Sequence, residues 1–175
     1  AHGGFNYIEF KQDKTINVTP VNLSSNRQLE LESHLMLFFT GFSRIASEVA
    51  KSKIANLETK KSELQRIRAQ VNEALELLQS SSDIRGIGEM LHQTWQYKRA
   101  LSAKVSTEAI DSIYTQARAA GAIGGKILGA GGGGVLLLFV EPEKQLTVRK
   151  ALSELVCVPF RFESTGSQIG YYQGL

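Results

Sequence analysis

The segment from Gly121 to Gly134 carries the residues whose types and spacing best suit chemistry. It holds eight of the sixteen glycines of the chain and ends in four consecutive ones. Ordering such a run costs a great deal of backbone entropy, so these positions require a conformation or a close approach that only glycine allows. A bare backbone can lie against a neighbouring segment or direct several N–H groups at a phosphate. We therefore predict a loop that contacts an anion or another chain segment.

Two nucleotide-binding patterns can be tested against this segment. A P-loop needs a glycine five residues before Gly125 and a Ser or Thr after Lys126, but the sequence has Ala120 and Ile127 at these positions. A dinucleotide fingerprint is formally present over 129–134, yet any glycine run satisfies it. The residues that follow are typical of a strand, whereas the fingerprint must open a helix. Both patterns are therefore disfavoured.

Hydrophobic spacing predicts the elements that position this loop. Residues 124–128 and the apolar run 135–140 are typical of two paired strands with the glycines as their turn, although composition alone also allows a flexible tip without a partner. Further elements are expected as follows: a hairpin over 5–10 and 15–19, a loop over 22–26, a buried strand over 35–39, one long helix from Ser43 to Leu78, a helix with Ile84, Ile87, Leu91 and Trp95 inward, a helix capped by Ser106 with Ala109, Ile113, Ala117 and Ala120 inward, a last helix from Pro142, an edge strand over 158–162, and a further strand over 168–172. We expect residues 1–175 to form a single domain with a mostly antiparallel sheet and helices packed on one side.

Composition excludes several classes of protein. With 175 residues, 42% of them hydrophobic, the chain is large enough for one globular core, and its net charge of +3 is too small to indicate nucleic-acid binding. One cysteine and three scattered histidines exclude a disulfide framework and a Cys/His zinc site. The single cysteine fits a reducing, cytoplasmic compartment, and the longest apolar run is far too short to span a membrane.

The segment 125–134 resembles the third conserved motif of the GHMP kinases, a superfamily of small-molecule kinases. That motif is specific when a helix precedes it and a hydrophobic strand follows, and both conditions are met here. The stretches 2–10, 39–47, 91–99 and 158–162 resemble the branch of the family that phosphorylates D-glycero-D-manno-heptose 7-phosphate. The resemblance covers nearly the whole chain.

This resemblance implies an α+β, ferredoxin-like C-terminal domain of a sugar kinase. Such an enzyme uses ATP and Mg²⁺ to transfer the γ-phosphoryl group to a sugar hydroxyl. The family's phosphate-binding loop and catalytic aspartate belong to an N-terminal domain, which we expect to be absent from this chain. Its three aspartates, Asp13, Asp83 and Asp111, are expected in a hairpin turn, a helix cap and a helix, and none of them matches the catalytic aspartate. We therefore expect no catalytic residue here and no activity from this chain alone. Its first partner would be its own N-terminal domain.

The resemblance also implies roles for particular residues. Gly129, Ala130, Gly131, Gly132, Gly133 and Gly134 are expected to lie against the phosphate loop of the missing domain. Lys98 and Arg99, supported by Arg44, are expected to bind the phosphate of the sugar, because a dianion requires paired cations. The alternative for each is a solvated charge at a helix end or an ion-pair partner. His92 is expected on a helix face, and Lys126 is expected to structure the strand edge.

Three alternatives stay open from the sequence. The substrate could be fucose or galactose instead of a heptose phosphate. A non-catalytic ligand- or RNA-binding module would also combine an antiparallel sheet with helices, although the basic residues here gather on the long helix and not on the sheet. Finally, the long helix expected from Ser43 to Leu78 has an apolar face that also includes Lys61 and Arg68, and this face could pair with a helix of another chain. The oligomeric state is therefore left open.

Overall fold

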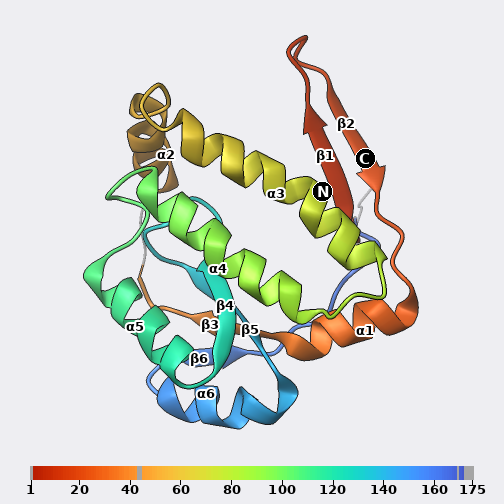
Figure 1. Cartoon of the computed structure of the whole chain (residues 1–175), viewed down its shortest axis with the longest axis vertical. Helices are drawn as coiled ribbons and strands as arrows, with labels where there is room; N and C mark the ends of the chain where they lie inside the picture. Colours follow the sequence, from red (N-terminus) through yellow and green to blue (C-terminus); the bar gives the residue numbers. More distant parts are fainter. Residues whose placement is uncertain (1, 43–44, 169, 172–175) are drawn as a thin grey trace.

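The computed structural model describes residues 2–42, 45–168 and 170–171. Figure 1 shows the elements, which follow along the chain as β1 (Asn6–Phe10), β2 (Ile16–Pro20), α1 (Ser25–His34), β3 (Leu35–Phe39), α2 (Ala46–Ala55), α3 (Lys61–Gln79), α4 (Arg85–Ala100), α5 (Glu108–Ala119), β4 (Ala122–Ile127), β5 (Val135–Val140), η1 (Pro142–Lys144), α6 (Gln145–Ala151) and β6 (Val156–Val158). None of the described helices is long and apolar enough to cross a membrane.

The strands form a four-stranded sheet and a separate hairpin. The sheet has the order β4-β5-β3-β6, and every neighbouring pair is antiparallel. In chain order this is the arrangement of a ferredoxin-like fold, with the first and third strands at the centre. β1 and β2 pair only with each other, and the hairpin extends beside α3 (Figure 1). The expected α+β class and antiparallel sheet are confirmed.

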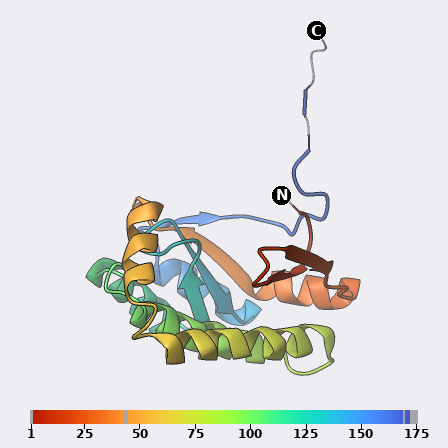
Figure 2. The same ribbon diagram turned by 90° about the horizontal axis from the view of Figure 1, so that it is seen from above.

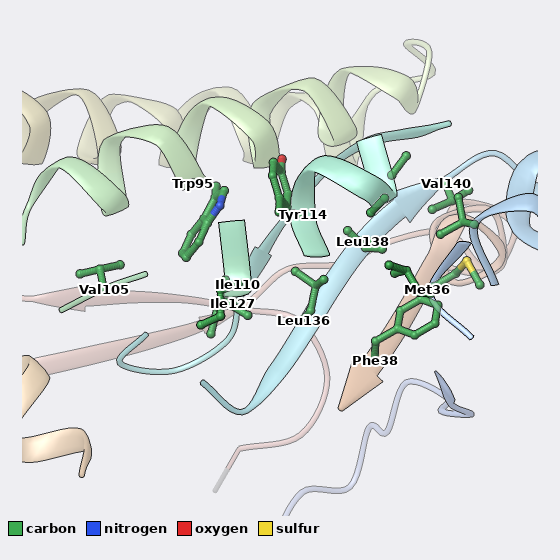
Figure 3. Close-up of a cluster of buried hydrophobic side chains, with 14 of the residues drawn as sticks. Met36, Phe38, Trp95, Val105, Ile110, Tyr114, Ile127, Leu136, Leu138 and Val140 are labelled. Carbon is green, nitrogen blue, oxygen red and sulfur yellow. The ribbon is translucent and has the colours of Figure 1, made fainter. Parts of the chain in front are cut away.

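Side chains of the central strand β5 alternate between two hydrophobic clusters. Leu136, Leu138 and Val140 join the larger cluster together with Met36 and Phe38 of β3, as Figure 3 shows. Phe139 points the other way into a second cluster. This alternation follows from the two-residue repeat of a strand. The prediction of a central strand covered on both faces is therefore confirmed.

The helices complete both clusters. α5 and α6 supply Ile110, Tyr114 and Val148 to the larger cluster, whereas Ile84 and Ile87 beside and within α4 belong to the second one. α3 and α4 lie together as one layer in Figure 2. α5 and α6 thus form the helix layer that we expected on one face of the sheet. α3 and α4 cover the other face of the sheet near β4.

The prediction of one continuous helix from Ser43 to Leu78 is wrong. The structure contains two helices, α2 and α3, separated by a turn over 56–60. Asn56 ends α2, and its side-chain amide donates to the carbonyl of Leu101 at 2.9 Å. This tertiary hydrogen bond holds the break, although the apolar spacing continues through it.

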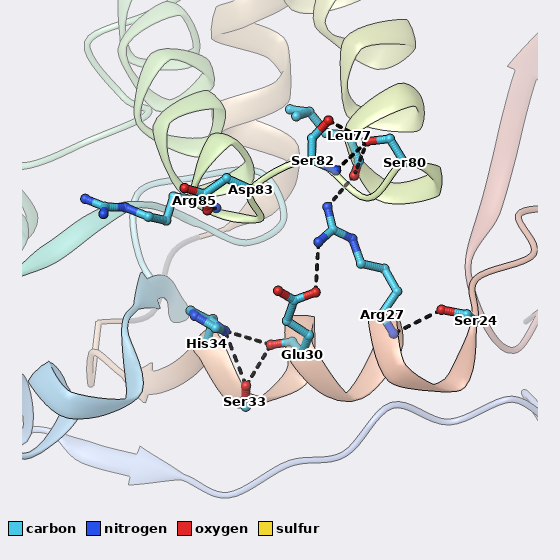
Figure 4. A network of polar contacts seen from close by, with 10 residues as sticks. All are labelled: Ser24, Arg27, Glu30, Ser33, His34, Leu77, Ser80, Ser82, Asp83 and Arg85. Atoms are coloured by element: carbon cyan, nitrogen blue, oxygen red, sulfur yellow. Dashed lines mark hydrogen bonds and ion pairs between the residues drawn. The ribbon is translucent and has the colours of Figure 1, made fainter.

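A second difference concerns the loop expected over 22–26, which ends at Ser24 because α1 begins at Ser25. The Ser24 hydroxyl caps α1 by accepting from the N–H of Arg27. The buried guanidinium of Arg27 then donates to Glu30 at 2.8 Å and to the carbonyl of Leu77 at 2.6 Å (Figure 4). Arg27 therefore ties α1 to the end of α3, which only the tertiary structure reveals.

Smaller differences lie at element ends. Thr107, and not Ser106, caps α5 by accepting from the N–H of Ile110, and Ala109 is exposed while Ile110 and Tyr114 face inward. The last strand, β6, covers 156–158 instead of 158–162, although it does lie at the sheet edge as expected. Of the further strand expected over 168–172, residues 168, 170 and 171 are not in a strand, and the others lie outside the described residues.

Candidate functional site

The glycine-rich segment forms the loop between β4 and β5. The N–H of Leu128 donates to the carbonyl of Val135 at 2.9 Å and closes the base of the loop. Gly129, Gly131, Gly132 and Gly134 have φ values of +71°, +106°, +76° and +94°. L side chains rarely adopt this backbone region, so the loop conformation requires glycine. The predicted strand, glycine turn, strand unit is confirmed.

Two neighbouring segments hold the loop through their backbone carbonyls. The N–H of Gly132 donates to the carbonyl of Val105 at 2.7 Å, and the N–H of Gly134 donates to that of Phe42 at 2.9 Å. A Cβ added at Gly131 would lie 2.7 Å from the Val105 oxygen, and one at Gly133 would overlap the Phe42 oxygen. Glycine is thus needed here for closeness as well as for conformation.

Two lysines hold the loop from the other side. Nζ of Lys98 donates to the carbonyl of Ile127 at 3.0 Å and to that of Gly129 at 2.7 Å. Nζ of Lys53, on α2, donates to the carbonyl of Ala130 at 3.2 Å. Both ammonium groups therefore neutralise carbonyl dipoles of the loop.

The N–H groups of the loop are left available. Those of Gly129, Ala130, Gly131 and Gly133 have no hydrogen-bond partner among the described residues. A loop with lysines on its carbonyls and free N–H groups presents positive potential, the arrangement that binds an anion. Gly129 is itself exposed, so at least this donor can be reached from solvent.

The electrostatics of the loop are unbalanced. Burial, together with the charges of Lys126 and Lys53, lowers the pKa of Lys98 to about 8. None of these three lysines forms an ion pair with any carboxylate in the part of the chain that the structure describes. An anion placed at this loop would therefore relieve repulsion among the lysines.

The residues expected to bind a sugar phosphate do not converge. Lys98 contacts the loop, whereas the neighbouring Arg99 pairs with Asp111, its Nη2 lying 2.6 Å from Oδ2. Arg44 lies outside the described residues. His92 lies partly buried on α4, and its Nδ1 is 2.8 Å from the hydroxyl of Tyr114. Burial and the charge of Arg118 lower the pKa of this histidine.

Some residues of the site carry no signal in the sequence. Val105 and Phe42 act through backbone carbonyls, which any residue type supplies. Lys53 could be seen only as one of many basic residues between 44 and 68, and its contact with Ala130 depends on the break between α2 and α3. Among the described residues, no three His, Cys, Asp or Glu side chains gather in a way that could hold a metal ion.

The ferredoxin-like sheet and the glycine loop agree with a family comparison. Residues 72–156, just under half of the chain, match the family model of the GHMP kinases C terminal. The resemblance predicted from the glycine motif is thereby confirmed.

Three relatives show which kinases the chain is similar to. A D-glycero-alpha-D-manno-heptose 7-phosphate kinase of Campylobacter jejuni is 33% identical over 152 residues, which cover 86% of this chain and 44% of that protein. The crystal structure of a D-glycero-D-manno-heptose 1-phosphate kinase from Bacteroides thetaiotaomicron superposes with a TM-score of 0.65 and 27% identity, covering 95% of this chain and 44% of that one. An L-fucokinase/L-fucose-1-P guanylyltransferase of Bacteroides fragilis is 27% identical over 83% of this chain and 15% of its own length. The chain thus spans less than half the length of the curated relatives that it matches.

Proposed function

We propose that this chain is one domain of an ATP-dependent sugar kinase, and that this domain closes over the phosphoryl group during its transfer. We also propose that the sugar is a heptose phosphate. The observation that carries the proposal is the loop 129–134, where lysines hold carbonyls and four N–H groups lack partners among the described residues. Phosphoryl transfer depends on positioning and on stabilisation of charge, and such a loop contributes to both. The similarity to the Campylobacter jejuni heptose 7-phosphate kinase supports the choice of sugar.

The catalytic aspartate and the phosphate-binding loop of the kinase come, in this proposal, from an N-terminal domain outside residues 1–175. ATP is the phosphoryl donor, and Mg²⁺ accompanies it. Mg²⁺ is commonly held by one or two carboxylates and the substrate phosphates. In this proposal the ion belongs to the nucleotide and the N-terminal domain, and no step of the mechanism passes through this chain's own side chains to the metal.

Gly129→Asn in the longer kinase tests the role of the loop. A side chain at Gly129 meets open space, and asparagine tolerates its φ of +71°, so the substitution adds bulk without disturbing the fold. We expect kcat to fall at least tenfold, because the added side chain prevents close approach of the two domains. Gly4→Asn is the matched control, since Gly4 has a φ of +73° and equally open surroundings. Unchanged kcat in a folded Gly129→Asn enzyme would contradict the proposal.

Arg44, Lys98 and Arg99 are retained as proposed ligands of the sugar phosphate. Arg99→Gln and Lys98→Gln should each raise KM for the phosphorylated sugar much more than KM for ATP, because the lost cation pairs with the sugar's dianion. Equal effects on both substrates would count against this role. To bind the phosphate, Arg99 would have to give up Asp111, and Lys98 would have to give up the carbonyls of Ile127 and Gly129. Asp111→Asn frees Arg99 and should therefore leave KM for the sugar unchanged or lower it.

A second candidate function is phosphorylation of L-fucose, which the similarity to the Bacteroides fragilis L-fucokinase/L-fucose-1-P guanylyltransferase supports. The two substrates differ in charge, since only the heptose phosphate carries a phosphate group. Comparing kcat/KM for heptose 7-phosphate and for L-fucose in the longer kinase decides between them.

A further inference from the structure

A cavity lies between the β1–β2 hairpin, α3, α4 and the sheet, and its wall includes Lys126 of β4, which precedes the glycine loop by three residues. Its volume is about 530 Å³, within the range of small-molecule sites. Most of the wall is apolar and includes Tyr7, Leu75, Leu78, Leu91 and Leu137. No carboxylate lines it.

The polar side chains of this cavity come from four elements, and those of β1 are Tyr7 and Asn6, whose amide donates to the carbonyls of Gly3 and Gly4. Gln70 of α3 and Thr94 of α4 satisfy each other, because the Thr94 hydroxyl donates to the Gln70 side-chain oxygen at 2.7 Å. The Gln70 amide donates onward to Gln93 at 3.3 Å. Lys126 of β4 is the only cation in the wall, and it has no hydrogen-bond or ion-pair partner among the described residues.

The register of the sheet fixes the position of Lys126. It pairs with Leu137 across β4 and β5, so both residues share the face that lines the cavity. Its sequence neighbours Gly125 and Ile127 are buried on the opposite face, where Ile127 joins the larger cluster. Lys126 therefore cannot leave the cavity wall without a change of strand register.

An ammonium group in such a wall is costly. Burial lowers the pKa of Lys126, because the charged form loses contact with water. The charge of Lys126 in turn lowers the pKa of Lys98. A group with a negative charge beside Lys126 would remove this cost, while the apolar wall can accept only an apolar body. The two requirements together define a ligand that is anionic at one end and apolar along the rest.

We propose that this cavity binds an amphipathic carboxylate, with the carboxylate against Lys126 and its apolar body along α3, α4 and the hairpin. No residue of the loop 129–134 lines this cavity, although Lys126 also lies close enough to Lys98 to affect its charge. Binding of the carboxylate does not depend on kinase activity. Its ligand class differs from a sugar phosphate, because the wall offers few hydrogen-bonding groups and those of Gln70 and Thr94 are already paired.

Isothermal titration of the 175-residue chain with octanoate and with octanamide tests the proposal. The two probes have the same apolar chain and differ in charge. We expect octanoate to bind with one molecule per chain and at least tenfold more tightly than octanamide. Lys126→Met should reduce octanoate affinity to the level of octanamide, and Lys126→Arg should retain most of it. Lys150→Met is the matched control, because Lys150 is exposed on α6.

A second variant locates the site without changing charge. Ala74, on α3, lines the cavity, so Ala74→Phe should fill it and abolish binding of both probes. Circular dichroism and thermal unfolding report whether each variant is folded, and if Lys126→Met is not, the Ala74→Phe and Lys126→Arg results decide the question. The proposal is overturned if octanoate does not bind or if octanamide binds as tightly. It is also overturned if a folded Lys126→Met chain keeps the octanoate affinity of the wild type, or if a folded Ala74→Phe chain still binds either probe.

Discussion

Gly131→Ala should destabilise the protein more than Gly129→Ala, although the two glycines lie in the same loop. Both have positive φ, so each substitution carries the conformational cost of about 1–2 kcal/mol for an L residue in this region. At Gly131 the new Cβ would also lie 2.7 Å from the Val105 carbonyl oxygen, whereas at Gly129 it would meet open space. Relief of that overlap moves the loop away from Val105 and weakens the hydrogen bond from Gly132, which contributes about 1 kcal/mol.

The expected losses are therefore about 2–3 kcal/mol for Gly131→Ala and about 1–2 kcal/mol for Gly129→Ala. Urea unfolding followed by circular dichroism measures the free energy of unfolding of each variant, with equal m-values as the check on two-state behaviour. For a chain of this size the extra loss at Gly131 corresponds to a further fall in Tm of about 2–4 °C.

Equal destabilisation by the two substitutions would refute this reasoning. It would mean that backbone conformation alone requires glycine in the loop, and that the close approach to Val105 contributes nothing.

Two further predictions concern α4 and α5. The pKa of Lys98 is about 8 in the folded protein against an ordinary 10.5, so between these pH values the unfolded chain binds more protons and the free energy of unfolding should rise with pH. Urea unfolding at pH 8 and pH 10 should show a larger rise in this free energy for the wild type than for Lys98→Met. Equal rises would contradict the lowered pKa. Thr107→Ala should cost about 1 kcal/mol, because the Thr107 side chain caps α5 by accepting from the N–H of Ile110. An unchanged Tm would contradict this cap.

Much of the sheet could be predicted because its strands are short apolar runs with clear ends. The runs 35–39 and 135–140 became β3 and β5 without change of bounds. The glycine turn between the last two long strands was also located correctly, since no other structure explains so many glycines in one segment. Local composition was sufficient in each case.

The helix break at 56–60 could not be predicted, because the apolar spacing continues across it without a change. Ile54, Leu57 and Leu64 continue the expected repeat, and the break is held by the bond from Asn56 to the carbonyl of Leu101, 45 residues away. The partners of the glycine loop were equally hidden, because backbone carbonyls have no residue signature. Lys98 and Arg99, adjacent in sequence, point to different partners, and only the structure separates them.

The hydrogen bonds that hold the glycine loop also bear on when it forms. The carbonyl of Gly134 accepts from the hydroxyl of Thr40, 94 residues earlier in the chain, and Gly132 depends on Val105. Contacts that close such long stretches of chain are expected late in folding, after β3 and the α4–α5 connection have come together. The loop then lies outside the folding nucleus, so substitutions within it should accelerate unfolding and leave the refolding rate nearly unchanged. The glycine loop would then take its final conformation last, on a scaffold that is already complete.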